Sequence, residues 1–477
     1  MATERYDLVV IGGGSAGLVA AGLAAALGAR VALLDRERLG GECLWTGCVP
    51  SKSLIAGARA ARQTRDLGMF GLSGHLDPVD LGAVMERVQG VIATISRGED
   101  AETMRKRGID VRFGEVTFRS PHELTVDGQP LRGRAFLLCT GSSAAVPSIE
   151  GLAGSAYLTN ETVFDLRELP THLIVAGGGP VGVEMTQAFR RLGSAVTVLV
   201  GERGLLPRED DEVRRAVADL FEHEGITVQR SRLAGVARDG GGVHVRHTGP
   251  SGEGDLRGDR LLLALGRRPN VAGLGLEQAG VRYELKQGIT IDPYLRTSAP
   301  HILACGDVTG PYQFTHAAGF QAAVAVRNAL FPWLKTKAHL EPMPWTTFID
   351  PEVARVGQTE AEARRSHGKV LVLRAEFAHT DRALAEGQTA GFVKLIVTPW
   401  RGTILGGHIV GPRAGELIQE VTLAMRRGLS VRALADTIHV YPTLAMALQQ
   451  AALGFYGQWP LYRVARRPLR VLAHRVR

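Results

Sequence analysis

The sequence predicts an α/β fold that contains two copies of one β–α–β unit and a third region of mixed α and β structure. The first observation is an internal repeat, because residues 6–35 and 171–200 both read as a buried strand, a glycine-rich turn, a helix and a second strand. The second is a change of character after Met343, where strand patterns such as 392–397 precede a helical run at 415–428. The length of 477 residues fits about three domains.

Composition and charge exclude several classes of protein. Hydrophobic residues make up 45% of the chain and charged residues 22%, which is globular composition and unlike that of disordered, collagen-like or disulfide-scaffolded chains. The formal net charge is +8, but six Arg and no acid lie in residues 459–477, which leaves +2 for the other 458 residues. The charge therefore predicts no nucleic-acid partner.

The termini and the cysteine content bear on the compartment. No apolar run reaches the roughly 18 residues that span a bilayer, and the N-terminus lacks the basic and apolar segments of a signal peptide. A cytoplasmic location is therefore expected. The only cysteines are Cys43, Cys48, Cys139 and Cys305. So few in a long chain favour redox or metal chemistry at one pair over structural disulfides.

Each repeat carries the pattern G-x-G-x-x-G between its first strand and its helix. The glycines are Gly12, Gly14 and Gly17 in the first copy and Gly177, Gly179 and Gly182 in the second. A Cβ at these places would keep the backbone amides of the helix N-terminus away from a pyrophosphate. The paired context predicts two Rossmann-like dinucleotide-binding domains, two dinucleotides and a hydride that passes between them.

The second strands of the two repeats end differently. Asp35 lies 23 residues after Gly12, where an acid binds the ribose hydroxyls of an adenosine. The matching residue of the second repeat is Val200, followed closely by Glu202 and Arg203. A missing acid with a nearby Arg favours a 2′-phosphate, and hence NADPH over NADH. Two alternatives stay open, because Glu202 could bind the ribose after a small shift and Arg203 could be a solvated loop charge.

The segment GGECLWTGCVPSK, residues 40–52, contains Cys43 and Cys48. Cys43 lies eight residues after Asp35. Four further segments add to this pattern, namely TGSSAAVPSIEG at 140–151, GRRPN at 266–270, ACGDV at 304–308 and YPT at 441–443. With the two repeats, these segments resemble the flavin-dependent pyridine nucleotide-disulfide oxidoreductases, which include dihydrolipoamide dehydrogenase, glutathione reductase and mercuric reductase. The resemblance extends to about Ala452.

This resemblance implies a role for each matching residue. The FAD site would consist of the first repeat's glycines with Asp35, Lys52, Thr140, Gly141 and Asp307. The NAD(P) site would consist of the second repeat's glycines with Arg203 and Gly266. The catalytic set would be Cys43, Cys48, Lys52, Glu184 and Tyr441, in which Lys52 and Glu184 form an ion pair beside the flavin. Cys139 and Cys305 lie in apolar strands and are expected in the core.

The implied chemistry is an electron route through sulfur. A hydride would pass from nicotinamide to flavin, and the reduced flavin would open a Cys43–Cys48 disulfide. Cys43 would then attack a disulfide or bind a soft metal ion, whereas Cys48 would face the flavin. An inert structural bridge is the disfavoured alternative, because structural disulfides are rare inside cells. No resident metal is predicted.

The chain departs from the family at its acid–base dyad. Members that exchange disulfides carry His-Pro-Thr followed by Glu, where this chain has Tyr441 and Met446. Tyr is a poor proton shuttle near neutrality, so disulfide exchange should be slow. His439 could substitute, although a structural role is favoured. A Tyr here resembles mercuric reductases, but the absence of a Cys after Cys305 argues against efficient mercuric delivery.

The resemblance also implies the domain order. We expect an FAD-binding domain in two parts, 1–150 and 277–342, an NAD(P)-binding domain at 151–276, and an α+β dimerisation domain at 343–458. In the homodimer, Tyr441 would reach the partner's redox site. The basic tail, 459–477, is expected to be solvated or to strap the dimer, in preference to contacting a membrane surface. Trp45 either narrows the acceptor pocket or packs under the redox helix.

Three functions compete at this point. The first is an NAD(P)H-dependent, FAD-containing reductase of a thiol-reactive acceptor, such as a metal ion, a quinone or an activated disulfide. The second is a dihydrolipoamide dehydrogenase, against which the lost dyad argues. The third is a flavin-bound redox sensor or scaffold without turnover, against which the intact cofactor and cysteine motifs argue.

Overall fold

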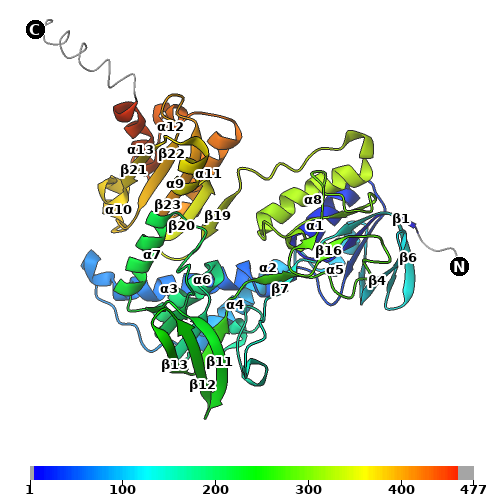
Figure 1. The fold of residues 1–477 in the computed structure, drawn as a ribbon, viewed down its shortest axis with the longest axis horizontal. Helices are drawn as coiled ribbons and strands as arrows, with labels where there is room; N and C mark the ends of the chain where they lie inside the picture. Colours follow the sequence, from blue (N-terminus) through cyan, green and yellow to red (C-terminus); the bar gives the residue numbers. More distant parts are fainter. Residues whose placement is uncertain (1–4, 460–477) are drawn as a thin grey trace, which may run out of the picture.

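The computed structural model describes residues 5–459, and a seven-stranded sheet forms the first part of them (Figure 1). Its order is β3-β2-β1-β6-β5-β4, with β18 paired to the C-terminal half of β6. The strands are β1 (Arg5–Ile11), β2 (Val31–Asp35), β3 (Ile109–Phe113), β4 (Val116–Ser120), β5 (Glu123–Val126), β6 (Gln129–Leu138) and β18 (Ile302–Ala304). Because β18 joins a sheet begun by β1, segments far apart in the sequence build one domain.

The helices of this part include the two that frame the redox cysteines. They are α1 (Ser15–Ala26), α2 (Gly41–Trp45), α3 (Cys48–Arg65), α4 (Leu81–Ser96), α5 (Ala101–Lys106) and α8 (Thr315–Leu330). Alanines of α1 and α8 share one core cluster with the sheet, which lets the two helices pack closely. A Cβ at Gly17 in α1 would lie 1.8 Å from the carbonyl oxygen of Gly12. The close approach of α1 to the preceding turn therefore requires glycine at this residue.

The second part repeats the same β–α–β unit. A four-stranded parallel sheet has the order β10-β9-β8-β14, and an antiparallel sheet β11-β12-β13 lies beside it. The elements are β8 (His172–Ala176), α6 (Pro180–Leu192), β9 (Ala195–Leu199), α7 (Asp211–His223), β10 (Thr227–Gln229), β11 (Arg232–Asp239), β12 (Gly242–Gly249), β13 (Gly252–Gly258) and β14 (Arg260–Leu263). A Cβ at Gly182 would lie 1.9 Å from the carbonyl oxygen of Gly177, so both repeats use their third glycine identically.

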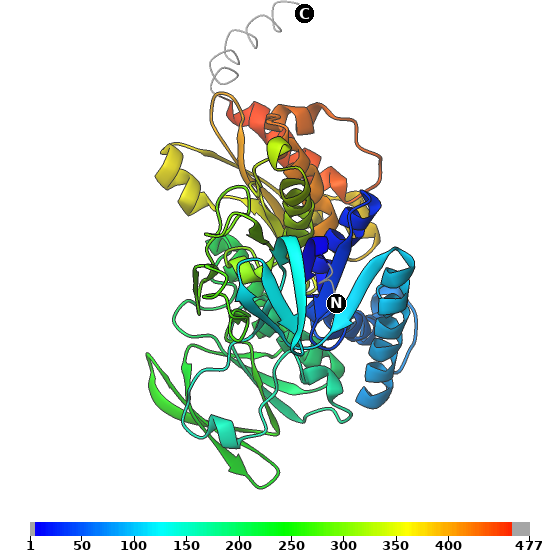
Figure 2. The ribbon, with the colours of Figure 1, turned by 90° about the vertical axis from the view of Figure 1, so that its right-hand side faces the viewer.

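The third part is an antiparallel sheet with helices, as the sequence predicts for an α+β domain. Its order is β19-β20-β23-β22-β21. The elements are β19 (Pro344–Thr347), β20 (Glu352–Gly357), α9 (Glu360–His367), β21 (Leu371–Glu376), α10 (Asp381–Ala385), β22 (Phe392–Val397), β23 (Ile404–Gly411), α11 (Ala414–Arg426), α12 (Val431–Asp436) and α13 (Ala445–Gln458). Figure 2 shows this part and the β11–β13 sheet at opposite ends of the molecule.

Two short ribbons complete the fold. One pairs β7 (Ser142–Ala144) with β15 (Arg267–Pro269), and the other pairs β16 (Tyr283–Glu284) with β17 (Gly288–Ile289). The first ribbon carries the chain between the FAD and nucleotide sheets in both directions. The exact domain boundaries stay predictions.

A buried ion cluster ties the nucleotide part to the C-terminal part. The ammonium group of Lys394, whose side chain is 3% exposed, contacts Asp210 at 2.8 Å, Glu360 at 2.9 Å and Glu212 at 3.1 Å. Removing Lys394 would leave the carboxylate of Asp210, which is 4% exposed, without its cation in the interior, so this contact links the nucleotide part to the C-terminal part.

No helix of residues 5–459 is both long enough and apolar enough to cross a membrane. The expectation about the basic tail concerns residues 459–477, of which 460–477 lie outside the described range.

Candidate active site

One cavity of about 1850 Å³ connects both glycine-rich turns, the two redox cysteines and the start of the C-terminal part. Most of the residues that the sequence predicts as site residues line it, namely Gly12, Gly14, Asp35, Cys43, Cys48, Lys52, Thr140, Gly141, Gly177, Gly179, Glu184, Gly266 and Asp307. Gly17 and Gly182 instead face the carbonyl groups of their own turns. Arg203 and Tyr441 are exposed and are not among the lining residues.

The first glycine-rich turn fits the FAD that the family resemblance implies. Helix α1 begins at Ser15 with no side chain capping its N-terminus, so its amides are available to a pyrophosphate. The carboxylate of Asp35 is held by the amides of Gly13 at 2.7 Å and Glu37 at 3.1 Å. It therefore lies at the end of β2, where a ribose-binding acid is needed.

The second glycine-rich turn fits a nicotinamide dinucleotide in the same way. Helix α6 begins at Pro180 after Gly179, again with no capping side chain, and both residues line the cavity. Glu202 is paired with Arg232 at 3.0 Å on the surface. Arg208, which belongs to no sequence motif, lines the cavity and lies 5.1 Å from the centre of the Trp345 ring. The preference for NADPH stays a prediction.

Lys52 and Glu184 form an ion pair between α3 and α6. The Lys52 ammonium lies 2.9 Å from the Glu184 carboxylate, whose other oxygen accepts a hydrogen bond from the Phe348 amide at 2.9 Å. The Glu184 side chain is 5% exposed, and the ammonium also lies 4.5 Å from the centre of the Phe348 ring. The pair therefore joins the FAD, nucleotide and C-terminal parts where they line one cavity.

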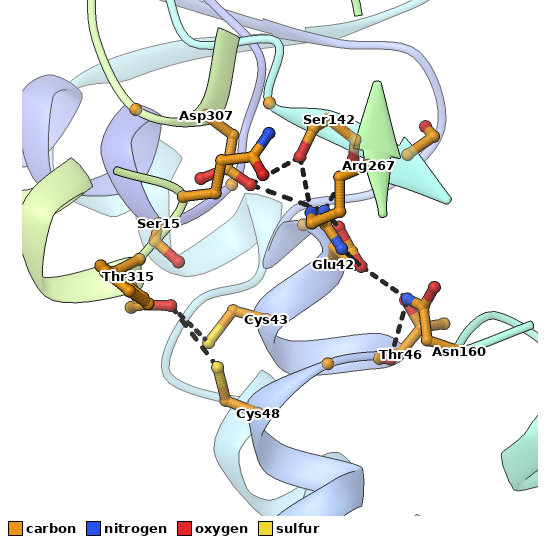
Figure 3. A pocket seen from close by; sticks show the side chains of 18 of the residues that line it. Ser15, Glu42, Cys43, Thr46, Cys48, Ser142, Asn160, Arg267, Asp307 and Thr315 are labelled. Carbon is orange, nitrogen blue, oxygen red and sulfur yellow. Dashed lines mark hydrogen bonds and ion pairs between the residues drawn. The ribbon is translucent and has the colours of Figure 1, made fainter. Parts of the chain in front are cut away.

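The redox cysteines are free thiols that share one hydroxyl group (Figure 3). The Thr315 hydroxyl lies 3.2 Å from the Cys43 sulfur and 3.6 Å from the Cys48 sulfur. Cys43 lies on α2, Cys48 is the first residue of α3, and Thr315 is the first residue of α8. The sequence signals the cysteine pair, whereas Thr315 has no motif of its own and only the fold brings it there.

The two thiols differ in acidity. The hydrogen bond from Cys48, helped by those from Thr315 and Ser15, outweighs burial and lowers the pKa of Cys43 to about 6. The same hydrogen bond raises the pKa of Cys48, which keeps the shared proton. Near neutral pH these shifts favour one thiolate in the dithiol, on Cys43, and its role as the nucleophilic sulfur stays a prediction.

Alkylation of the reduced protein tests this difference. Because the pKa of Cys43 lies at about 6, its thiolate fraction, and therefore its rate of reaction with iodoacetamide, should rise as the pH rises through about 6 and then level off. Mass spectrometry of the Cys43 peptide across pH gives the midpoint, and Thr315→Val should move it upward. A midpoint near the ordinary thiol value of about 8.5 would contradict the assignment.

Tyr441 and His439 make contacts within their own domain. The Tyr441 hydroxyl donates to Asp381 at 2.9 Å, which raises the pKa of this tyrosine further above its usual value of about 10. Both ring nitrogens of His439 have partners, the Thr437 carbonyl at 2.9 Å and the Glu420 carboxylate at 3.0 Å. With its side chain 6% exposed, His439 has the surroundings of a structural histidine.

Trp45 both packs against its own segment and lines the cavity, so both of its predicted roles stay open, whereas the other two cysteines lie in the core. The Trp45 indole donates to the Leu39 carbonyl at 2.7 Å and lies 4.2 Å from the Arg38 guanidinium, although its ring also lines the cavity. Cys139 and Cys305 are buried in the core around β6 and β18, with their sulfurs 3.5 Å apart. Among residues 5–459, no group of three His, Cys, Asp or Glu side chains could hold a metal ion.

Two dinucleotide-binding parts that open onto one cavity with a dithiol define a flavin- and nicotinamide-dependent oxidoreductase. The chain belongs to the pyridine nucleotide-disulphide oxidoreductase family, whose sequence model matches residues 6–322. The dimerisation domain of the same family matches residues 343–452. FAD and NAD(P)H are therefore the cofactors, as the sequence predicts.

Relatives with different acceptors resemble the whole chain. A mercuric reductase of Streptomyces lividans is 36% identical over 457 residues, which cover 94% of this chain and 96% of the relative. A dihydrolipoyl dehydrogenase of Thermus scotoductus is 34% identical over 476 residues, covering 95% and 98%. A solved structure, the Cu(II) complex of the HOCl-induced flavoprotein disulfide reductase RclA from Escherichia coli, has a TM-score of 0.84 at 28% identity, covering 94% and 99%.

Proposed function

We propose that this protein is an NAD(P)H-dependent flavoprotein reductase that passes electrons through the Cys43–Cys48 couple to a thiol-reactive acceptor, with a soft metal ion as the favoured acceptor. The observation that carries the proposal is the asymmetric dithiol, in which the pKa of Cys43 is lowered to about 6. When bound, the flavin and the nicotinamide supply the hydride-transfer chemistry.

The chain's own residues would divide the remaining work. Cys43 is the sulfur that binds the acceptor, because it is anionic near neutrality and a thiolate is the ligand that soft metal ions prefer. Cys48 keeps the proton until the couple closes. Closing this thiolate–thiol pair to a disulfide releases two electrons and the one proton of Cys48, and two electrons are enough to reduce one Hg²⁺ to the metal or two Cu²⁺ to Cu⁺.

The missing dyad supports a metal over a disulfide acceptor. Reducing an ordinary disulfide needs an acid for the leaving thiolate. Tyr441 stands where disulfide-exchanging relatives carry His, and its pKa is raised by Asp381. Metal reduction has less need of such a relay. The mercuric reductase and the Cu(II) complex among the similar proteins point the same way.

The C-terminal domain supports a homodimer. Ile438, Val440 and Tyr441 are 96%, 76% and 68% exposed, which is unusual for apolar and aromatic side chains beside a family dimerisation domain. A partner subunit that covers this segment would bring Tyr441 towards the other subunit's redox cysteines, as the sequence predicts.

An acceptor screen under air-free conditions tests the proposed function. NADH and NADPH are each tested with mercuric and cupric ions, quinones, lipoamide and glutathione disulfide. We expect turnover of a metal ion to exceed that of lipoamide. Lipoamide turnover faster than every metal would make the protein a dihydrolipoamide dehydrogenase instead, and failure of both nucleotides to bleach the flavin would make it a sensor or scaffold.

A further inference from the structure

Two chain segments connect the nucleotide sheet to the FAD sheet, and both contact Glu42, which lies on the helix α2 that also carries Cys43. The segment 145–171 runs from β7 to the first nucleotide strand, β8, and β15 brings the chain back from the last nucleotide strand, β14. Strands β7 and β15 pair with each other, with Arg267 opposite Ala144 and Pro269 opposite Ser142. Any rotation of the nucleotide part relative to the flavin site must bend this ribbon.

Glu42 on α2 joins both segments (Figure 3). One carboxylate oxygen accepts a hydrogen bond from the Asn160 amide at 2.5 Å, and Asn160 also donates to the Thr46 carbonyl at 3.3 Å. The carboxylate is bound in addition by both terminal nitrogens of Arg267. Asn160 lies in the segment that leads into the nucleotide part, and Arg267 lies in the strand that leads back from it. Both therefore bind the Glu42 side chain.

Arg267 extends this contact to the flavin side of the cavity. Its guanidinium donates to the Ser142 hydroxyl at 2.8 Å and to the Ser142 carbonyl at 3.1 Å, and lies 3.5 Å from the Asp307 carboxylate. The Glu42 and Arg267 side chains are only 24% and 22% exposed. A two-pronged Arg–carboxylate pair in such surroundings fixes direction as well as distance, unlike a solvated surface pair.

We propose that Glu42 is a positioning residue, which locks the nucleotide-binding part in register with the FAD site through Arg267 and Asn160. Hydride transfer depends steeply on alignment, so a loose ribbon between the two dinucleotide sites would slow this step even with both cofactors bound. Glu42 is also the residue before Cys43 on α2, so the same contacts hold the helix that carries the reactive sulfur. The inference rests on the family's cofactors and not on which acceptor is reduced.

Hydrogen exchange of the flavin-loaded protein measures the lock directly. Glu42→Gln keeps the shape of the side chain and removes its charge. We expect backbone amides in peptides that cover 142–144, 158–162 and 266–270 to exchange about tenfold faster, because the Arg267 contact weakens. Glu42→Asp should restore part of the protection. The matched control is Glu123→Gln, which breaks the 2.7 Å Arg132–Glu123 pair between β5 and β6 of the FAD sheet, away from the cavity.

Rapid mixing gives the second readout. Flavin reduction by NAD(P)H should be slowed about tenfold in Glu42→Gln at saturating nucleotide, with little change in KM, whereas reduction by dithionite should be unchanged. Asn160→Ala leaves Arg267 and Asp307 intact, and it should slow flavin reduction by NAD(P)H to a smaller extent. This variant tests the proposal if Glu42→Gln fails to bind flavin. Unchanged exchange in the three peptides, or faster exchange with unchanged reduction by NAD(P)H, would overturn the proposal.

Discussion

Replacing Cys43 with Ser is expected to lower turnover of a metal or disulfide acceptor by at least about 10³-fold while leaving flavin reduction by NAD(P)H nearly unchanged. The reason is the charge of this sulfur, because the lowered pKa of Cys43, about 6, favours its thiolate near neutral pH. A serine hydroxyl at the same place stays neutral and binds soft metals poorly. The nucleotides deliver electrons on the flavin side and do not need Cys43.

Two measurements separate these steps. Stopped-flow absorbance follows flavin bleaching by NAD(P)H, and steady-state assays follow acceptor reduction. Cys305→Ala is the matched control, since it removes a thiol buried in the core and off the proposed route. Retained acceptor turnover in Cys43→Ser would mean that electrons leave directly from the flavin, and would refute the sulfur route.

Restoring the acid–base dyad is expected to change which acceptor is preferred. In the double variant Tyr441→His and Met446→Glu, turnover of glutathione disulfide or lipoamide should rise by about 10²-fold, the usual contribution of a positioned general acid. Metal turnover should change by less than about twofold, because it has less need of this proton relay. The imidazole would also lie near Asp381, which now accepts from Tyr441 at 2.9 Å.

Ile438→His is the control for this prediction. It adds the same imidazole to a neighbouring residue that is 96% exposed, without replacing the family's catalytic position. Steady-state rates with one disulfide and one metal acceptor are compared for each variant. Equal gains with both acceptors, or a gain in Ile438→His as large as in the double variant, would contradict the dyad argument.

Local sequence patterns were enough to predict the two dinucleotide-binding units. Strand hydrophobicity and glycine spacing define each β–α–β unit within about 30 residues, and both units form as expected, from β1 to β2 and from β8 to β9. The resemblance then extended the prediction to the C-terminal domain and to the Lys52–Glu184 pair, whose ion contact is 2.9 Å long. The role of Arg203 in nucleotide binding has no such support and stays a prediction, because a single charge in a loop carries no periodic signal.

The sequence by itself determined that two dinucleotide-binding units and one cysteine pair occur in one chain, since each depends on residues that are close neighbours along the backbone. The tertiary structure decided what surrounds the sulfurs. Thr315 reaches Cys43 across 272 residues, and Arg267 reaches Glu42 across 225. Contacts at such separations depend on how sheets and helices pack against one another, which is why no local pattern could supply the shared hydroxyl or the residue that joins both connections of the nucleotide part.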